Sequence, residues 1–245
     1  MDNSKNNVKS DLDELLIETR RLYTERAVGN KAITQHCIVL DVDDTLLQTY
    51  LEISDLRKLK IFEKSTPECT LLRERILTLE IEDVSEVKGQ GDDLHVFSLL
   101  RPGLRQFLEF CGLYFKTVMI WSAGMTPYVH AVVDELFKDI PNPRLVFSRK
   151  DCDKPKEDFI KPLKKITDLY PDLSIEHIFA LDDRPEVFAG NRLNLITIPE
   201  YRPEATLEDF ARQDICFTRL IEWFLQPHVI QAEDVRTLEK KKIFK

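Results

Sequence analysis

Short apolar runs without polar alternation recur along the chain, and amphipathic helical patterns separate them. The runs cover residues 37–40, 117–121, 144–147, 177–181 and 193–198. A short run of this kind is typical of a strand that is buried on both faces of a parallel sheet. Because strands that alternate with helices form βαβ units, we expect an α/β fold with a central parallel sheet and helices on both of its faces.

Amphipathic patterns predict the helices between these strands. One runs over residues 102–112 and should stop at Gly112, and a second should take Thr126 as its N-cap. A third should start at Pro162 and turn Leu169 inward with its other apolar residues. These helices would cover the two faces of the sheet.

Helical patterns are also expected outside the repeating unit. Residues 11–26 predict a helix ahead of the first strand, ended by residues 28–30, and residues 206–225 predict one or two helices. The chain closes on the basic segment 240–245, and we expect everything after Pro227 to be solvated end material. A docking or localisation signal is the alternative for this segment.

Residues 46–100 do not follow the alternation of strands and helices. The stretch 76–84 alternates apolar and polar residues, as does part of 94–100, and the turn-forming residues 88–93 lie between them. Alternation in two segments joined by a turn predicts a β-hairpin or a small antiparallel sheet. We therefore expect an antiparallel β-insert directly after the first strand.

Length and composition indicate one domain of ordinary size. We place it at residues 31–226 of the 245, between an N-terminal helical extension (1–30) and a basic C-terminal tail (227–245). No window approaches about 18 consecutive apolar residues, and the first residues lack the layout of a signal peptide. We expect an intracellular protein of the nucleus or cytoplasm with no membrane partner. Five scattered cysteines without a CxxC pair predict reduced thiols.

Charge and glycine content exclude several binding functions. The formal net charge of −8 argues against a general nucleic-acid binder, whose surface should be basic. The sequence contains neither GxGxxG nor GxxxxGK[ST], which excludes the glycine-rich loops of Rossmann and P-loop nucleotide binding.

Acidic residues follow two of the predicted strands at the points where they end. Asp41 and Asp43 follow the first run, and Asp182 and Asp183 follow the fourth. The carboxyl ends of parallel strands line a common crevice, where four carboxylates would repel one another unless a cation neutralised them. Oxygen donors without clustered His or Cys favour Mg²⁺. On its own, the segment 41–45 is also compatible with a turn that caps a helix.

Two further polar residues occupy suggestive positions between the acidic segments. Ser122 follows the run 117–121 and precedes a helix start, and a hydroxyl group with free backbone N–H groups at a helix N-terminus binds phosphate well. Lys161 precedes Pro162, so it should be extended just outside a helix. Taken alone, they would be a loop serine and a surface lysine.

In order and spacing, the segments around Asp41, Ser122, Lys161 and Asp182 resemble the four motifs of haloacid-dehalogenase-type phosphatases. The chain is most similar to the RNA polymerase II C-terminal-domain phosphatases, also called NLI-interacting-factor-like, over roughly residues 36–225. It departs from that family by an Asp-Asp pair in place of Asp-Asn in the last motif, and by Lys-Pro-Leu in place of Lys-Asp-Leu. The matching segments are DVDDTL at 41–46, RPG at 101–103, WSA at 121–123, RKDC at 149–152 and FIKPL at 159–163.

The resemblance implies a haloacid-dehalogenase-like fold of the small, single-domain type and a Mg²⁺-dependent aspartyl-phosphate mechanism. Asp41 would be the nucleophile and Asp43 the general acid and base, while Ser122 and Lys161 would hold the transferring phosphoryl group. The implied metal ligands are Asp41, Asp43 through its backbone carbonyl, Asp182, and Asp183 through water. The implied substrate contacts are Thr45, Ser122, Ala123, Arg149 and Lys161.

The same resemblance implies a phosphorylated protein as partner. The substrate would be phosphoserine or phosphothreonine, for example in the RNA polymerase II C-terminal repeats. One alternative is a phosphatase of small metabolites or of nucleic-acid ends, for which Arg149, Lys150, Lys154 and Lys156 could form a local basic groove. Another is a non-catalytic adaptor that keeps the fold. The sequence does not indicate an oligomeric state.

Overall fold

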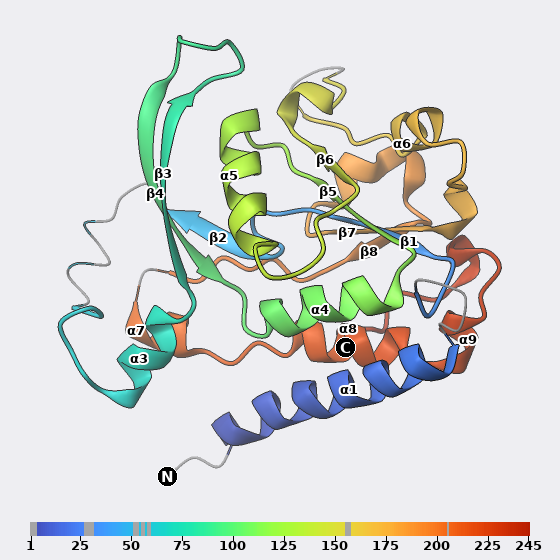
Figure 1. Cartoon of the computed structure of the whole chain (residues 1–245), viewed down its shortest axis with the longest axis horizontal. Helices are drawn as coiled ribbons and strands as arrows, with labels where there is room; N and C mark the ends of the chain where they lie inside the picture. The colour runs from blue at the N-terminus through green and yellow to red at the C-terminus, as the bar shows by residue number, and fades with distance from the viewer. Residues whose placement is uncertain are drawn as a thin grey trace.

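The computed structural model describes residues 4–26, 32–50, 54, 57, 60–154, 158–204 and 206–245. Five parallel strands form a central sheet, and three antiparallel strands form a smaller sheet beside it (Figure 1). The predicted α/β fold with an antiparallel insert is therefore confirmed. Residues 28–30, which we expected to end the first helix, and Lys156 lie outside the described residues.

The central sheet has the strand order β6-β5-β1-β7-β8, which places the first strand in the middle. In the register, Leu40 pairs with Ile120 on one side and with Leu181 on the other. The residues that follow these three positions therefore emerge side by side at one edge of the sheet. The strands are β1 (Cys37–Leu40), β5 (Thr117–Trp121), β6 (Leu145–Phe147), β7 (Ile178–Asp182) and β8 (Leu195–Thr197).

Helices cover both faces of this sheet, which explains why its strands show no polar alternation. Ile38 and Leu40 face a cluster formed with α4 (Leu104–Tyr114), α5 (Thr126–Leu136) and α8 (Cys216–Phe224). Val39 and Met119 face a second cluster, which contains α6 (Lys164–Leu169) and the 3-10 helix Pro185–Asn191. Each strand thus needs apolar residues on both sides.

Three details of the predicted helices are wrong. α4 passes through Gly112, because a buried ring at Tyr114 completes its apolar face and outweighs the low helix propensity of glycine. The N-cap of α5 is Met125, and the Thr126 side chain instead bonds to Glu86 and Ser148. Leu169, in the last turn of α6, is 54% exposed rather than inward.

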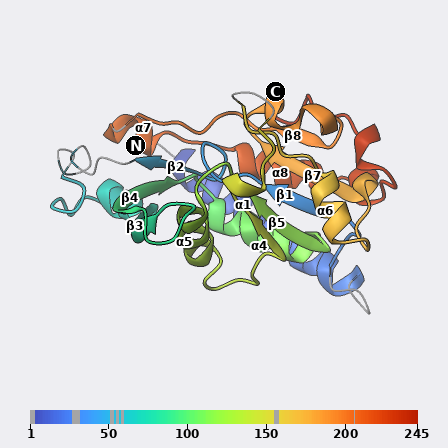
Figure 2. The ribbon, with the colours of Figure 1, turned by 90° about the horizontal axis from the view of Figure 1, so that it is seen from above.

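The insert forms a three-stranded antiparallel sheet in the order β2-β4-β3. Its long hairpin stands beside α5, with the helix between it and the central sheet (Figure 1). Seen from above, the small sheet occupies one end of the molecule (Figure 2). The elements are β2 (Leu47–Tyr50), α3 (Pro67–Arg73), β3 (Ile76–Val84) and β4 (Asp92–Leu100), and they confirm the predicted hairpin.

The N-terminal helix α1 (Ser4–Arg26) starts earlier than predicted and lies along α4 and α8 (Figure 1). Leu12 and Leu16 on its inner face are buried in the main core. The extension is thus packed against the domain. None of the helices in the described part of the chain is long and apolar enough to cross a membrane.

The C-terminal segment is packed, so the expectation of solvated end material is wrong for these residues. The predicted helices over 206–225 are present as α7 (Leu207–Ala211) and α8, and α9 (Pro227–Ile230) and the 3-10 helix Val235–Thr237 follow. Val229, Val235 and Ile243 join the core. Their irregular spacing among charged residues gives no helical or strand period, so the sequence pattern did not reveal them.

We predict that α1 contributes to the stability of the whole domain. Leu16→Ala should lower the free energy of unfolding by about 2–4 kcal/mol, because Leu16 is 5% exposed and its removal leaves a cavity. Ile17→Ala is the matched control, since Ile17 is 65% exposed on the same helix, and it should change stability by less than about 0.5 kcal/mol. Urea unfolding checks both, and equal losses would contradict the packing.

Candidate active site

The edge of the central sheet brings the predicted site residues together in one pocket of about 620 Å³. Asp41 follows β1, Ser122 follows β5 and Asp182 ends β7, as the strand register requires. Lys161 arrives from the loop before α6, where its backbone N–H donates to Val187 O at 2.7 Å. The predicted residues that line the pocket are Asp41, Asp43, Ser122, Ala123, Arg149, Lys161, Asp182 and Asp183.

A buried ammonium group joins two of the strand ends. Lys161 Nζ lies 2.5 Å from Asp41 Oδ1 and 2.6 Å from Asp182 Oδ2, and its side chain is 2% exposed. Burial raises the pKa of Asp41 to about 6 and that of Asp182 to about 7, although Lys161 opposes the rise in both. Burial alone would lower the pKa of Lys161, but the two carboxylates raise it above the usual value. The lysine is therefore held in its charged form.

Three carboxylates at this edge form a group that could hold a cation. Oxygens of Asp41, Asp182 and Asp183 all lie within 4.8 Å of one another. One lysine cannot neutralise three carboxylates, and burial together with Asp182 raises the pKa of Asp183 to about 6. A set of oxygen donors with excess negative charge fits a divalent cation such as Mg²⁺. The expected backbone ligand at Asp43 stays a prediction.

The Asp43 carboxylate lies apart from this group and has two hydroxyl partners. Ser122 Oγ donates to Asp43 Oδ2 at 3.3 Å, and Tyr128 OH donates to Asp43 Oδ1 at 2.5 Å. Val42, between the two aspartates, is buried in the core, as extended backbone predicts. Tyr128 was not predicted from the sequence, because its place in the first turn of an amphipathic helix marks it as a core residue.

The loop after β5 is shaped by tight packing around Ser122. Gly124 N donates to Ser122 Oγ at 2.9 Å, and a Cβ at Gly124 would stand 2.8 Å from the Tyr128 ring. Arg149 Nε donates to Ala123 O at 2.9 Å, and the Arg149 side chain lies at the exposed rim of the pocket. The Ser122 hydroxyl on this loop and Arg149, which follows β6, thus line the same opening.

Thr45 occupies a different position from the one expected. It is fully buried, and its Oγ1 contacts Asp183 Oδ1 and Asp183 N at 3.2 Å each. It does not reach the pocket lining given by the described residues. We therefore interpret Thr45 as a residue that positions Asp183, and the expected substrate contact is not supported.

An ion pair between Arg202 and Asp44, which was not predicted from the sequence, lines one side of the pocket. Arg202 forms ion pairs with Asp44 and Glu200, and Tyr201 N donates to Asp44 O at 2.6 Å. Asp44 has a φ of 59°, a left-handed conformation that this backbone contact holds. The residues lie far apart in sequence, so no local pattern could indicate the pair.

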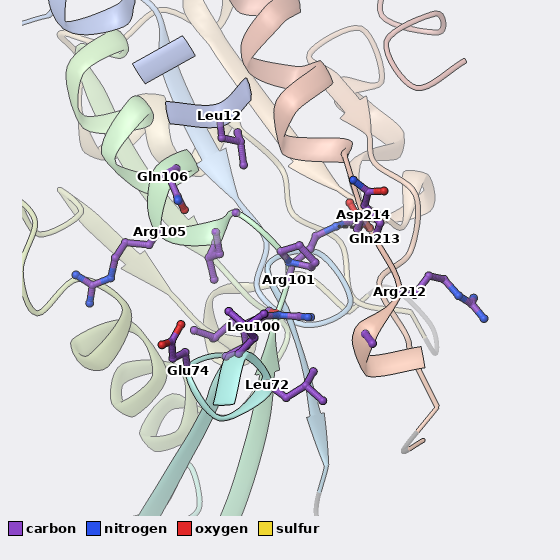
Figure 3. Close-up of a pocket in the computed structure, with 16 residues that line it drawn as sticks. Leu12, Leu72, Glu74, Leu100, Arg101, Arg105, Gln106, Arg212, Gln213 and Asp214 are labelled. Carbon is purple, nitrogen blue, oxygen red and sulfur yellow. Dashed lines mark hydrogen bonds and ion pairs between the residues drawn. The ribbon is translucent and has the colours of Figure 1, made fainter. Parts of the chain in front are cut away.

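Arg101 supports the acidic loop from behind. It is 1% exposed, donates to Thr45 O at 3.1 Å and pairs with Asp214 Oδ2 at 2.9 Å. Figure 3 shows this pair in a second pocket of about 480 Å³, whose lining combines leucines with charged residues such as Glu74 and Arg105. The arginine of the Arg-Pro-Gly segment thus has a structural role.

We predict a large stability cost for removing Arg101. Arg101→Met should lower the free energy of unfolding by about 3–5 kcal/mol, because it leaves Asp214 and two backbone carbonyls without their buried donor. Arg105→Met is the matched control, since Arg105 and its partner Asp139 are both exposed, and stability should barely change. Thermal unfolding of both variants checks this, and an unchanged Arg101→Met protein would contradict it.

Comparison with known proteins identifies the family to which this sequence belongs. The sequence profile of the NLI interacting factor-like phosphatases matches residues 36–236. The fold is similar to that of the fission yeast RNA polymerase II CTD phosphatase Fcp1 bound to beryllium fluoride, with a TM-score of 0.53 and 21% identity over 73% of this chain and 44% of that chain. A second structure, of Fcp1 as an essential RNA polymerase II CTD phosphatase, gives a TM-score of 0.52 and 20% identity over 76% of this chain and 45% of that chain.

The chain thus spans less than half the length of these solved chains, and at such identities they bear on the fold alone. The family match, by contrast, covers most of this sequence. The chain belongs to the NLI interacting factor-like phosphatase family of the haloacid-dehalogenase superfamily.

Proposed function

We propose that the protein is a Mg²⁺-dependent phosphatase that works through an aspartyl-phosphate on Asp41. The observation that carries the proposal is the position of Asp41 within the pocket. Its carboxylate lies in hydrogen-bond contact with Lys161 and next to Asp182 and Asp183, and the Asp43 carboxyl group opens into the same pocket. A nucleophile, a proton donor and a site for a cation are thus combined in one place.

The acidic group would hold the metal. Asp41, Asp182 and Asp183 would supply the side-chain oxygens for Mg²⁺. When bound, Mg²⁺ supplies the positive charge that lets an anionic carboxylate approach an anionic phosphate ester.

Asp41 and Asp43 act in both of the two steps of hydrolysis. In the first step an Asp41 oxygen bonds to phosphorus while the bond from phosphorus to the leaving oxygen breaks, and Asp43 gives that oxygen its proton. In the second step a water molecule attacks the phosphorus and Asp43 takes a proton from it. The bond from phosphorus to Asp41 breaks, which releases inorganic phosphate and restores the carboxylate. Ser122 and Lys161 hold the phosphoryl oxygens throughout.

For the substrate, we propose phosphoserine or phosphothreonine in proteins, such as the RNA polymerase II C-terminal repeats. The pocket is open, and Arg149 at its rim offers positive charge to a phosphorylated segment. The two solved structures are of proteins named as CTD phosphatases, which supports the same substrate class for this chain. A small-metabolite phosphatase is the alternative, and a phosphopeptide panel separates the two.

Activity is the first test. The protein should hydrolyse p-nitrophenyl phosphate with Mg²⁺ and not with EDTA, and Asp41→Asn should lower kcat by at least about a thousandfold, as loss of a nucleophile does. Asp139→Asn, which changes an exposed carboxylate paired with Arg105, is the control and should keep full activity. Folded protein without metal-dependent turnover would overturn the proposal and favour a non-catalytic adaptor.

Metal binding can be tested without turnover. In about 100-fold excess over its Kd, Mg²⁺ should stabilise the wild-type protein by about 2.7 kcal/mol, and Asp182→Asn should abolish most of the resulting rise in Tm. Glu200→Gln should keep the rise, because Glu200 lies outside the group of Asp41, Asp182 and Asp183 and is paired with Arg202. A rise in Tm that persists in Asp182→Asn but is lost in Glu200→Gln would place the cation in the group of Asp44, Asp183 and Glu200, and would contradict the proposed site.

A further inference from the structure

A chain of three hydroxyl groups connects the insert to Asp43. Tyr128 OH lies 2.5 Å from Asp43 Oδ1, and Thr49 Oγ1 lies 2.7 Å from Tyr128 OH. At its far end, Thr49 Oγ1 lies 2.7 Å from Ser98 Oγ. The two distances between hydroxyl groups are those of ordinary hydrogen bonds, and the contact with the Asp43 carboxyl group is shorter.

The three hydroxyl groups come from the insert sheet and from α5, which pack against each other. Thr49 in β2 and Ser98 in β4 are directly paired across the insert sheet, so their side chains share one face. Tyr128 lies in the first turn of α5, which packs against β3 of the same sheet. Ser98 is fully buried, Tyr128 is buried in the core and Thr49 is half-buried, so these bonds are largely shielded from water.

The buried Ser98 hydroxyl determines the direction of the hydrogen bonds between the three hydroxyl groups. Each hydroxyl has one proton, and within the described part of the chain the Ser98 hydroxyl has Thr49 as its hydrogen-bond partner. Ser98 therefore donates to Thr49, which leaves Thr49 to donate to Tyr128. The reverse direction would leave the Ser98 proton buried without an acceptor, which is unfavourable.

We propose that Tyr128 is a positioning residue for Asp43, held as a hydrogen-bond donor by the insert through Thr49 and Ser98. Tyr128 donates to Oδ1 at 2.5 Å and Ser122 donates to Oδ2 at 3.3 Å, so the shorter hydrogen bond favours the negative charge on Oδ1 and places the proton that Asp43 gives to the leaving oxygen on Oδ2. Asp43 Oδ2 is the oxygen that faces Ser122. The insert thereby orients the general acid, a role that rests on the phosphatase function proposed above.

Two esters that differ in their leaving group test this role. Phenyl phosphate needs a proton on its leaving oxygen far more than p-nitrophenyl phosphate, although the two rings fill nearly the same space. Tyr128→Phe should lower kcat/KM for phenyl phosphate by about tenfold or more, and by less than about threefold for p-nitrophenyl phosphate. kcat/KM includes only the steps through the first phosphoryl transfer, so the role of Asp43 as a base in the second step does not enter.

Further variants separate the hydroxyl chain from general damage. Thr49→Val should shift the ratio of the two kcat/KM values in the same direction as Tyr128→Phe, and Thr49→Ser should restore it. Tyr114→Phe is the matched control, because it removes another buried tyrosine hydroxyl, one that donates to Phe224 O at 2.7 Å outside the pocket. It should lower Tm without changing the ratio.

Equal losses for both esters in Tyr128→Phe would show a structural role only and overturn the positioning role. An unchanged ratio of the two kcat/KM values in Thr49→Val would show that the insert does not orient Tyr128. A wild-type protein that hydrolyses neither ester with Mg²⁺ would overturn the phosphatase function itself. That outcome is distinct from one in which the wild type is active and the ratio in Tyr128→Phe is unchanged.

Discussion

The buried ion pairs of Lys161 with Asp41 and Asp182 are the constraint on which the site depends. Two carboxylates from neighbouring strands could not stay charged at this depth without the ammonium group between them. Such an arrangement is costly, because a buried ion pair recovers only part of the desolvation energy of its members. A hydrophobic replacement would give a stable sheet edge, so the charges make sense as chemistry rather than as stabilisation.

The rest of the fold serves to hold those charges in place. The central position of β1, with β5 and β7 on either side, brings Asp41, Ser122 and Asp182 to one edge. From behind, Arg101 fixes the backbone at Thr45, whose hydroxyl in turn contacts Asp183. From the side, the insert reaches Asp43 through hydroxyl groups. Each catalytic candidate is thus supported by a separate part of the chain.

Much of this could be predicted from the sequence, because local patterns carry it. Buried strands, the alternating hairpin and the acids that end two strands all leave a signal within a few residues. The partners of those acids leave no such signal. Tyr128 looks like a core residue of a helix, Arg202 meets Asp44 across 158 positions, and the apolar residues of the C-terminal segment follow no period. The contact of Thr45 with Asp183 leaves no local signal either, since only the folded chain shows that its hydroxyl turns toward Asp183.

A direct measurement of the central claim is to trap the phosphorylated enzyme. The protein would be mixed with a ³²P-labelled phosphate ester and Mg²⁺, quenched in acid within milliseconds, and the labelled peptide identified by mass spectrometry. We expect label on the peptide that contains Asp41, removed by hydroxylamine as an acyl phosphate is. Label on Ser122 that resists hydroxylamine would contradict it.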